Sequence, residues 1–166
     1  MDIKQRLDEN TSELAELVAQ FPDTGFNQKP NEESWSAAEV IEHLFRTEFG
    51  TGRVLTGETK ITKDRDSDAV LAKIKKVALN RDDKLTASGP ILPTGGEKSK
   101  KELLGKFRQN REKVKELMTG LDLDELCLAF EHPIFGTLTR REWLEFNMMH
   151  TQRHMAQIEQ IQKAIK

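Results

Sequence analysis

The stretch that most constrains the fold of this chain is TRREWLEFNMMHTQRHMAQIEQIQKAI, residues 139–165. Good helix formers dominate it and neither Gly nor Pro interrupts it, so it predicts one long helix. Thr139 and Glu142 have the spacing of a capping box at its start. Steps of three and four residues trace one stripe, made up of Trp143, Asn147, His150, His154, Ile158, Ile161 and Ile165. Two histidines four residues apart therefore lie on the face expected to be buried.

The rest of the chain adds further amphipathic stretches and almost no strand signal. We expect long helices at 2–20, 36–55 and 99–119, with a shorter helical segment at 68–79. Residues 88–96, SGPILPTGG, predict a loop, which could lie over a pocket mouth. Four long amphipathic helices favour an all-α protein: an antiparallel four-helix bundle, with a long connection between the second and third long helices.

Composition narrows the class of protein. At 166 residues the chain fits a single domain, residues 1–166. Charged residues make up 33% of it and the formal net charge is −2, so nothing indicates nucleic acid or an anionic membrane as a partner. No apolar run approaches the roughly 18 residues that span a bilayer, and residues 1–10 lack a signal-peptide pattern. With a single cysteine, Cys127, we expect a cytoplasmic protein.

Three histidines are candidates for chemistry. His150 and His154 project side by side from one helix, and His43 lies at the edge of the buried face of the 36–55 helix. Buried imidazoles need partners, because an unsatisfied polar group costs about 1–3 kcal/mol. A divalent cation would satisfy them, and three protein ligands would leave a coordination position open. Ordinary hydrogen bonds within the core are the alternative interpretation.

Other polar residues carry weaker predictions. Glu39 stands three residues after Ser36, so capping explains it, although it could also orient His43 through a hydrogen bond. His132 is isolated in a connector and is a poor candidate for a ligand. Cys127 has no CxxC partner or nearby basic cluster, so a nucleophilic role is not expected.

Three motifs together resemble a known family. They are WSAAEVIEHL (Trp35 to Leu44), HPIFGTLTRREWL (His132 to Leu144) and HTQRHMAQI (His150 to Ile158). In this order they resemble the DinB/YfiT-like superfamily over nearly the whole chain. The resemblance implies a four-helix bundle with a divalent metal, commonly nickel or zinc, held by one histidine of the second helix and an H-x3-H pair on the last. These positions are His43, His150 and His154 here. Family members often form homodimers.

The resemblance also implies candidate activities. Characterised relatives include S-transferases that use a low-molecular-weight thiol, and others are described as metal-dependent hydrolases. We therefore expect an enzyme that transfers such a thiol to a small electrophilic substrate. The alternatives are a hydrolase that uses metal-bound water and a non-catalytic metal-binding bundle, which the sequence does not separate.

Overall fold

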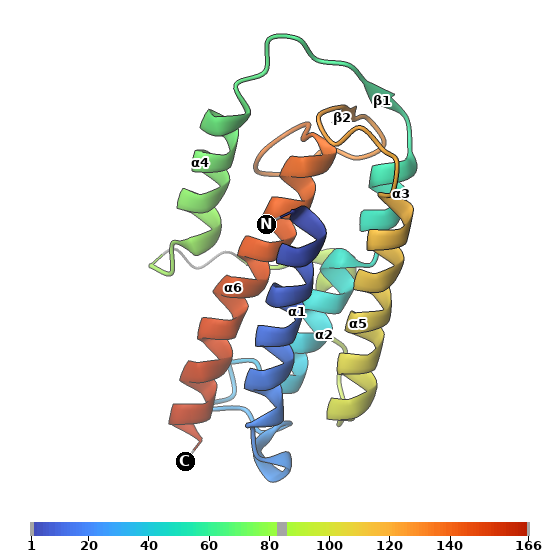
Figure 1. Ribbon diagram of the computed structural model, residues 1–166. Coiled ribbons are helices and arrows are strands. Elements are labelled where there is room, and N and C mark those ends of the chain that lie inside the picture. Colours follow the sequence, from blue (N-terminus) through green and yellow to red (C-terminus); the bar gives the residue numbers. More distant parts are fainter. Residues whose placement is uncertain (1, 83–85, 166) are drawn as a thin grey trace.

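The computed structural model describes residues 2–82 and 86–165. Four helices lie side by side as a bundle (Figure 1): α1 (Ile3–Ala19), α2 (Ala37–Glu48), α5 (Lys100–Leu117) and α6 (Arg140–Ala164). The predicted four-helix bundle is confirmed, and three helices match their predicted ranges within two residues. The expected 36–55 helix is interrupted near Phe49 and continues as the short α3 (Thr51–Thr56). No helix among the described residues is both long and apolar enough to cross a bilayer.

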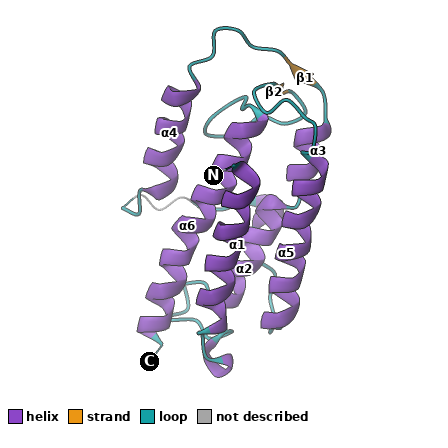
Figure 2. Cartoon of the chain, in the orientation of Figure 1, coloured by secondary structure: helices purple, strands orange, loops and turns teal. Residues whose placement is uncertain are grey.

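The connection between α2 and α5 contains more structure than the sequence indicated. After α3 come β1 (Thr59–Lys60), α4 (Ser67–Leu79) and the short 3-10 helix η2 (Gly89–Ile91). The α4 helix packs along the outside of α6 (Figure 1). Strand β1 pairs antiparallel with β2 (Leu126–Cys127), near the end of the bundle where α6 begins (Figure 2). This two-residue ladder was not predicted.

Helix directions in the bundle are mixed. Arg6 bonds Glu145 and Gln162 bonds the carbonyl of Gln20, so α1 and α6 run parallel. Figure 1 shows that α2 and α5 also start at the same end of the bundle. The prediction that the bundle is antiparallel is therefore only partly right, since just the α1–α5 and α2–α6 pairs have that arrangement. The cause is the long connection after α2. It runs back along the bundle, so α5 begins at the same end as α2 (Figure 1).

Capping residues determine where the helices begin. Both reciprocal hydrogen bonds of a capping box are present at Ser36 and Glu39, and again at Thr139 and Glu142. Asp2 forms a further capping box at the start of α1, which the sequence analysis did not predict. Because each cap fixes the first residue of its helix, it also fixes which later residues face the core.

A polar layer divides the bundle core into two apolar clusters. One cluster includes Leu55, Ile74, Leu138 and Leu144, and the other includes Leu14, Ile41, Phe107 and Ile158. Buried polar residues lie between them in sequence: Asn10 on α1, Glu48 on α2, Arg111 on α5, and Thr151 and His154 on α6. His43 lies on α2 within the range of the second cluster, and its ring contacts that of His154, with 4.9 Å between centroids. The candidate ligands thus lie in or beside this layer.

Candidate metal centre

His43 lies on the inner face of α2, and its side chain is buried. Its ring packs against Trp35, with the two ring centroids 5.0 Å apart. The Nδ1 atom lies 2.8 Å from the carbonyl oxygen of Ile91, in the loop that precedes α5. A carbonyl oxygen can only accept, so Nδ1 carries the proton and Nε2 presents its lone pair to the interior.

His150 and His154 face His43 from α6. The Nε2 atom of His150 lies 3.0 Å from that of His154 and 3.4 Å from that of His43. The ring of Phe146, one turn earlier, stacks on His150 with 5.4 Å between centroids. His154 is buried, whereas His150 is partly exposed as a residue, although its Nδ1 atom is buried and makes no hydrogen bond to the described residues. The structure thus brings together all three predicted ligand residues.

Burial favours the neutral form of each ring. Desolvation lowers the pKa of His43, although its bond to Ile91 acts in the opposite sense. Desolvation, followed by repulsion from the other two rings, lowers the pKa of His150 well below its usual range. The pKa of His154 falls to about 3, chiefly because of burial. At neutral pH all three imidazoles are therefore uncharged, which is the form that binds metal ions.

The geometry fits a divalent ion better than a purely hydrogen-bonded cluster. Tetrahedral zinc at its usual distance from imidazole nitrogen would separate its ligands by about 3.4 Å. The Nε2 atom of His150 lies 3.0 and 3.4 Å from those of His154 and His43, and one ring nitrogen from each of the three residues lies within 4.8 Å of the others. The Nδ1 of His154 lies 2.7 Å from Oε1 of Gln157, so this ring also presents its Nε2 lone pair. The Nε2 of His150 carries one proton at most, so it can donate a hydrogen bond to the Nε2 lone pair of either His43 or His154, but not to both. A cation would satisfy all three lone pairs.

Glu39 does not contribute to this arrangement. Its carboxylate accepts from the backbone N–H of Ser36 at 2.9 Å and pairs with Lys29 at 3.1 Å. The position beside Nδ1 of His43 is occupied by Ile91 instead. The expectation that Glu39 orients His43 is therefore wrong, because the capping geometry turns its carboxylate toward the start of the helix. The contact between the backbone carbonyl of Ile91 and His43 could not be predicted from the sequence, because every residue carries such a carbonyl.

His132 has a structural role. Its Nδ1 accepts the backbone N–H of Ile134 at 3.1 Å, and its backbone pairs with Gly136 in a tight turn of the connector. Gly136 adopts a φ of 72°, a left-handed conformation that favours glycine. Burial lowers the pKa of His132 to about 4. It is not among the three histidines that converge.

Sequence reasoning missed the buried ion pair of the polar layer. Arg111 and Glu48 are 2% and 1% exposed, and Nη2 of Arg111 lies 2.5 Å from Oε1 of Glu48. Thr151, the residue after His150, donates to the same carboxylate and accepts from Arg111. A signal was present, since Arg111 interrupts the apolar stripe of α5 between Phe107 and Val114. A charge at such a position is expected to have a buried partner.

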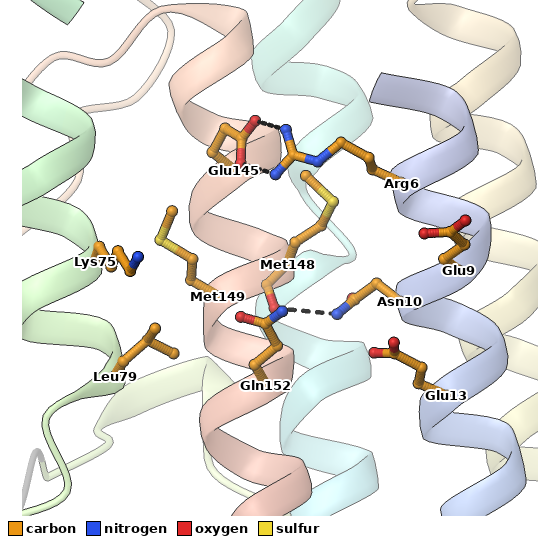
Figure 3. Close-up of a pocket in the computed structure, with 10 residues that line it drawn as sticks. All are labelled: Arg6, Glu9, Asn10, Glu13, Lys75, Leu79, Glu145, Met148, Met149 and Gln152. Carbon is orange, nitrogen blue, oxygen red and sulfur yellow. Dashed lines mark hydrogen bonds and ion pairs between the residues drawn. The ribbon is translucent and has the colours of Figure 1, made fainter. Parts of the chain in front are cut away.

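A separate cleft of about 260 Å³ lies on another side of α6 (Figure 3). Residues of α1, α4 and α6 line it, among them Glu13, Lys75 and Met149. Figure 3 shows the Arg6–Glu145 ion pair at one end and the bond from Asn10 to the carbonyl of Met148 below it. None of the three convergent histidines lines this cleft, so it is distinct from the candidate metal centre.

Comparison with known proteins places the chain in a family. The curated relative YuaE of Bacillus subtilis (strain 168), described as uncharacterised, is 28% identical over 148 residues, which are 87% of each chain. The solved four-helix bundle protein TT2238 superposes with a TM-score of 0.59 at 20% identity, over 95% of this chain and 96% of that one. YfiT from Bacillus subtilis, described as a probable metal-dependent hydrolase with an unusual four-helix bundle topology, gives a TM-score of 0.60 at 18% identity, over 98% and 85%. The sequence model of the DinB superfamily matches residues 6–158, and the chain therefore belongs to that superfamily.

Proposed function

We propose that this protein is a divalent-metal-dependent enzyme whose metal is held by His43, His150 and His154. The observation that carries the proposal is the convergence of three uncharged imidazoles, with ligand atoms within 4.8 Å of one another. Nickel or zinc is the metal we propose, because imidazole nitrogen suits both ions. Three protein ligands with a further position open is the arrangement of catalytic rather than structural zinc sites.

When bound, such a metal lowers the pKa of a thiol or a water molecule that coordinates it. The chain itself keeps the three rings neutral by burying them and fixes two of them through their Nδ1 atoms. Of the three ligand residues, only His150 is partly exposed, so we propose that a small nucleophile would approach from its side.

Our first candidate reaction is transfer of a low-molecular-weight thiol to a small electrophile. The three carboxylates of α2 that flank His43 are engaged elsewhere: Glu39, Glu42 and Glu48 each accept hydrogen bonds from other groups. Hydrolysis gains from a general base that takes a proton from water, whereas a thiol of lowered pKa ionises without one. In the transfer, sulfur bonds to the electrophilic carbon, the leaving group departs with the bonding electrons, and the thiol proton passes to solvent.

Hydrolysis is the second candidate. The description of YfiT as a probable metal-dependent hydrolase supports it, since that protein shares the fold. Both reactions require the same three ligands, so histidine variants cannot separate them. Parallel assays can, with a model electrophile plus glutathione, cysteine or other cellular thiols on one side and activated esters and amides on the other. Turnover of esters without any thiol-dependent reaction would exclude the transferase.

The metal site itself is tested by the metal content of protein purified without a metal-affinity tag. We expect near-stoichiometric nickel or zinc in the wild type and its loss in His150→Ala. The matched control is Gln160→Ala, an exposed position on the same helix, which should keep the metal. A wild type that contains no metal, even after incubation with divalent ions, would refute the proposal.

A non-catalytic role for the same metal is the alternative from another class of protein. It requires that no coordination position remains open to solvent or thiol. Binding of an exogenous thiol to the cobalt-substituted protein, seen as a new sulfur-to-metal charge-transfer band, would exclude it. Absence of such a band with every thiol tested would favour a structural metal.

A further inference from the structure

The loop before α5 is bound to α2 through polar groups. Within residues 89–98, named here the strap, the carbonyl of Pro90 accepts from Nε of Arg46 at 2.7 Å. The next carbonyl, that of Ile91, lies 2.8 Å from Nδ1 of His43. Arg46 follows His43 by three residues on α2, so one turn of the helix holds two consecutive carbonyl groups of the strap.

Glu42 binds the strap at a third point. Its Oε2 accepts the backbone N–H of Thr94 at 2.9 Å, and its Oε1 accepts the hydroxyl of the same residue at 2.8 Å. Lys98 pairs with the same carboxylate at 3.3 Å and donates to the carbonyl of Thr94 at 2.6 Å. Asn27 then holds the backbone of Lys98 from the opposite side, with bonds of 2.8 and 2.9 Å. The strap is therefore fixed on both sides of Ile91.

The strap contributes nothing to the apolar core. None of residues 89–98 belongs to either hydrophobic cluster, and the side chains of Leu92 and Thr94 are exposed. No strap residue is fully buried, and the strap is attached to α2 by hydrogen bonds to Glu42, His43 and Arg46. A segment that does not stabilise the core but directs a carbonyl at a candidate ligand is suited to control that ligand.

We propose that the strap positions His43 for metal binding, and that Glu42, through Thr94, is the residue that holds it in place. This inference rests on the proposed metal centre. An imidazole can coordinate through either nitrogen, and its ring can flip. The Ile91 carbonyl selects the tautomer with the proton on Nδ1 and the ring orientation that directs Nε2 toward His150. Partners of this kind typically change metal affinity by about 10–100-fold.

The strap and the metal should also stabilise each other. If strap attachment raises metal affinity, linkage requires that metal binding strengthens strap attachment by the same factor. We therefore expect slower amide exchange of the strap in the metal-loaded protein, with Thr94 as the most informative amide because it donates directly to Glu42.

The test compares Thr94→Val, which removes the hydroxyl donor but keeps the shape, with Thr94→Ser, which retains the hydroxyl. Glu42→Gln is the second perturbation, and Leu92→Ala is the control, an exposed strap residue whose side chain makes none of these bonds. Cobalt affinity is measured by competition with a chelator, and the cobalt d–d spectrum reports the ligand geometry. We expect Thr94→Val and Glu42→Gln to weaken binding by about 10-fold, with an altered spectrum. Thr94→Ser and Leu92→Ala should resemble wild type.

A metal-free readout accompanies the affinity measurement. Nitrogen chemical shifts of His43 in the metal-free protein should report the Nδ1-protonated tautomer in wild type and Thr94→Ser. They should report a mixture of tautomers in Thr94→Val and Glu42→Gln. If wild type binds cobalt but Thr94→Val and Glu42→Gln bind it as tightly, the strap proposal fails and the metal centre stands. A wild type that binds no cobalt overturns both proposals.

Discussion

Replacing Glu48 with Gln should strongly destabilise the protein, because it leaves the Arg111 guanidinium buried without a counterion. Arg111 is 2% exposed, and Glu48 accepts from both its Nε and its Nη2. The remaining acceptors from other residues would be neutral: Oδ1 of Asn10 at 3.2 Å, Oγ1 of Thr11 at 3.5 Å and Oγ1 of Thr151 at 3.0 Å. Removing one partner of a buried ion pair costs about 3–5 kcal/mol. Gln preserves one acceptor and the volume, so we expect a loss of about 3 kcal/mol in the free energy of unfolding.

Urea unfolding followed by helical circular dichroism measures this loss. Arg141→Gln is the control: it also removes an ion pair, but the side chains of Arg141 and Asp124 are 40% and 68% exposed, so the expected cost is below about 1 kcal/mol. The double variant Glu48→Leu/Arg111→Met removes both charges and should recover most of the stability lost by Glu48→Gln. A cost for Glu48→Gln no larger than that of Arg141→Gln would contradict the reasoning, as would a double variant less stable than Glu48→Gln.

Three further predictions concern metal, thiol reactivity and pH. Zinc or nickel at 100 times its dissociation constant should stabilise the fold by about 2.7 kcal/mol, and His154→Ala should abolish the resulting rise in melting temperature; an equal rise in the variant would argue against the site. Burial raises the pKa of Cys127 to about 11, so at pH 8 a thiol reagent should modify it only when the protein unfolds, and rapid labelling of native protein would contradict its buried position. The folded pKa of His132, about 4, lies below its unfolded value of about 6.5. The unfolded state therefore binds more protons, and stability should fall as pH drops from 6.5 toward 4, by up to about 3 kcal/mol from this group. His132→Asn, which can still accept the turn hydrogen bond, should reduce that slope in urea unfolding curves; an unchanged slope would show that His132 does not contribute.

Several parts of the fold follow from local sequence alone. Capping boxes at Ser36 and Thr139 set the starts of α2 and α6. Helical periodicity then places His43, His150 and His154 toward the interior, since residues three and four apart share a face. These features depend on neighbours within one or two turns, and both the helices and the candidate ligands could therefore be predicted.

Other parts depend on contacts between segments far apart in the chain. The parallel packing of α1 on α6 arises from the path of the connection between α2 and α5, for which single-helix periodicity carries no information. The pairing of Glu48 with Arg111 joins two helices 63 residues apart, and its signal in the sequence was an isolated charge within an apolar stripe. Ile91 orients His43 through its backbone carbonyl oxygen. Every residue type carries this acceptor, so the identity of residue 91 gives no sign of the contact.

The sequence by itself therefore determined the helices, the stripe that contains the histidines and the identity of the three candidate ligands. Only the tertiary structure decided how the three rings meet, which nitrogen of His43 faces His150, and which groups hold the rings in place. The physical reason is the range of the interactions. Helix formation and capping act over three or four residues, whereas a buried polar group takes whichever partner the packed chain brings within hydrogen-bonding distance.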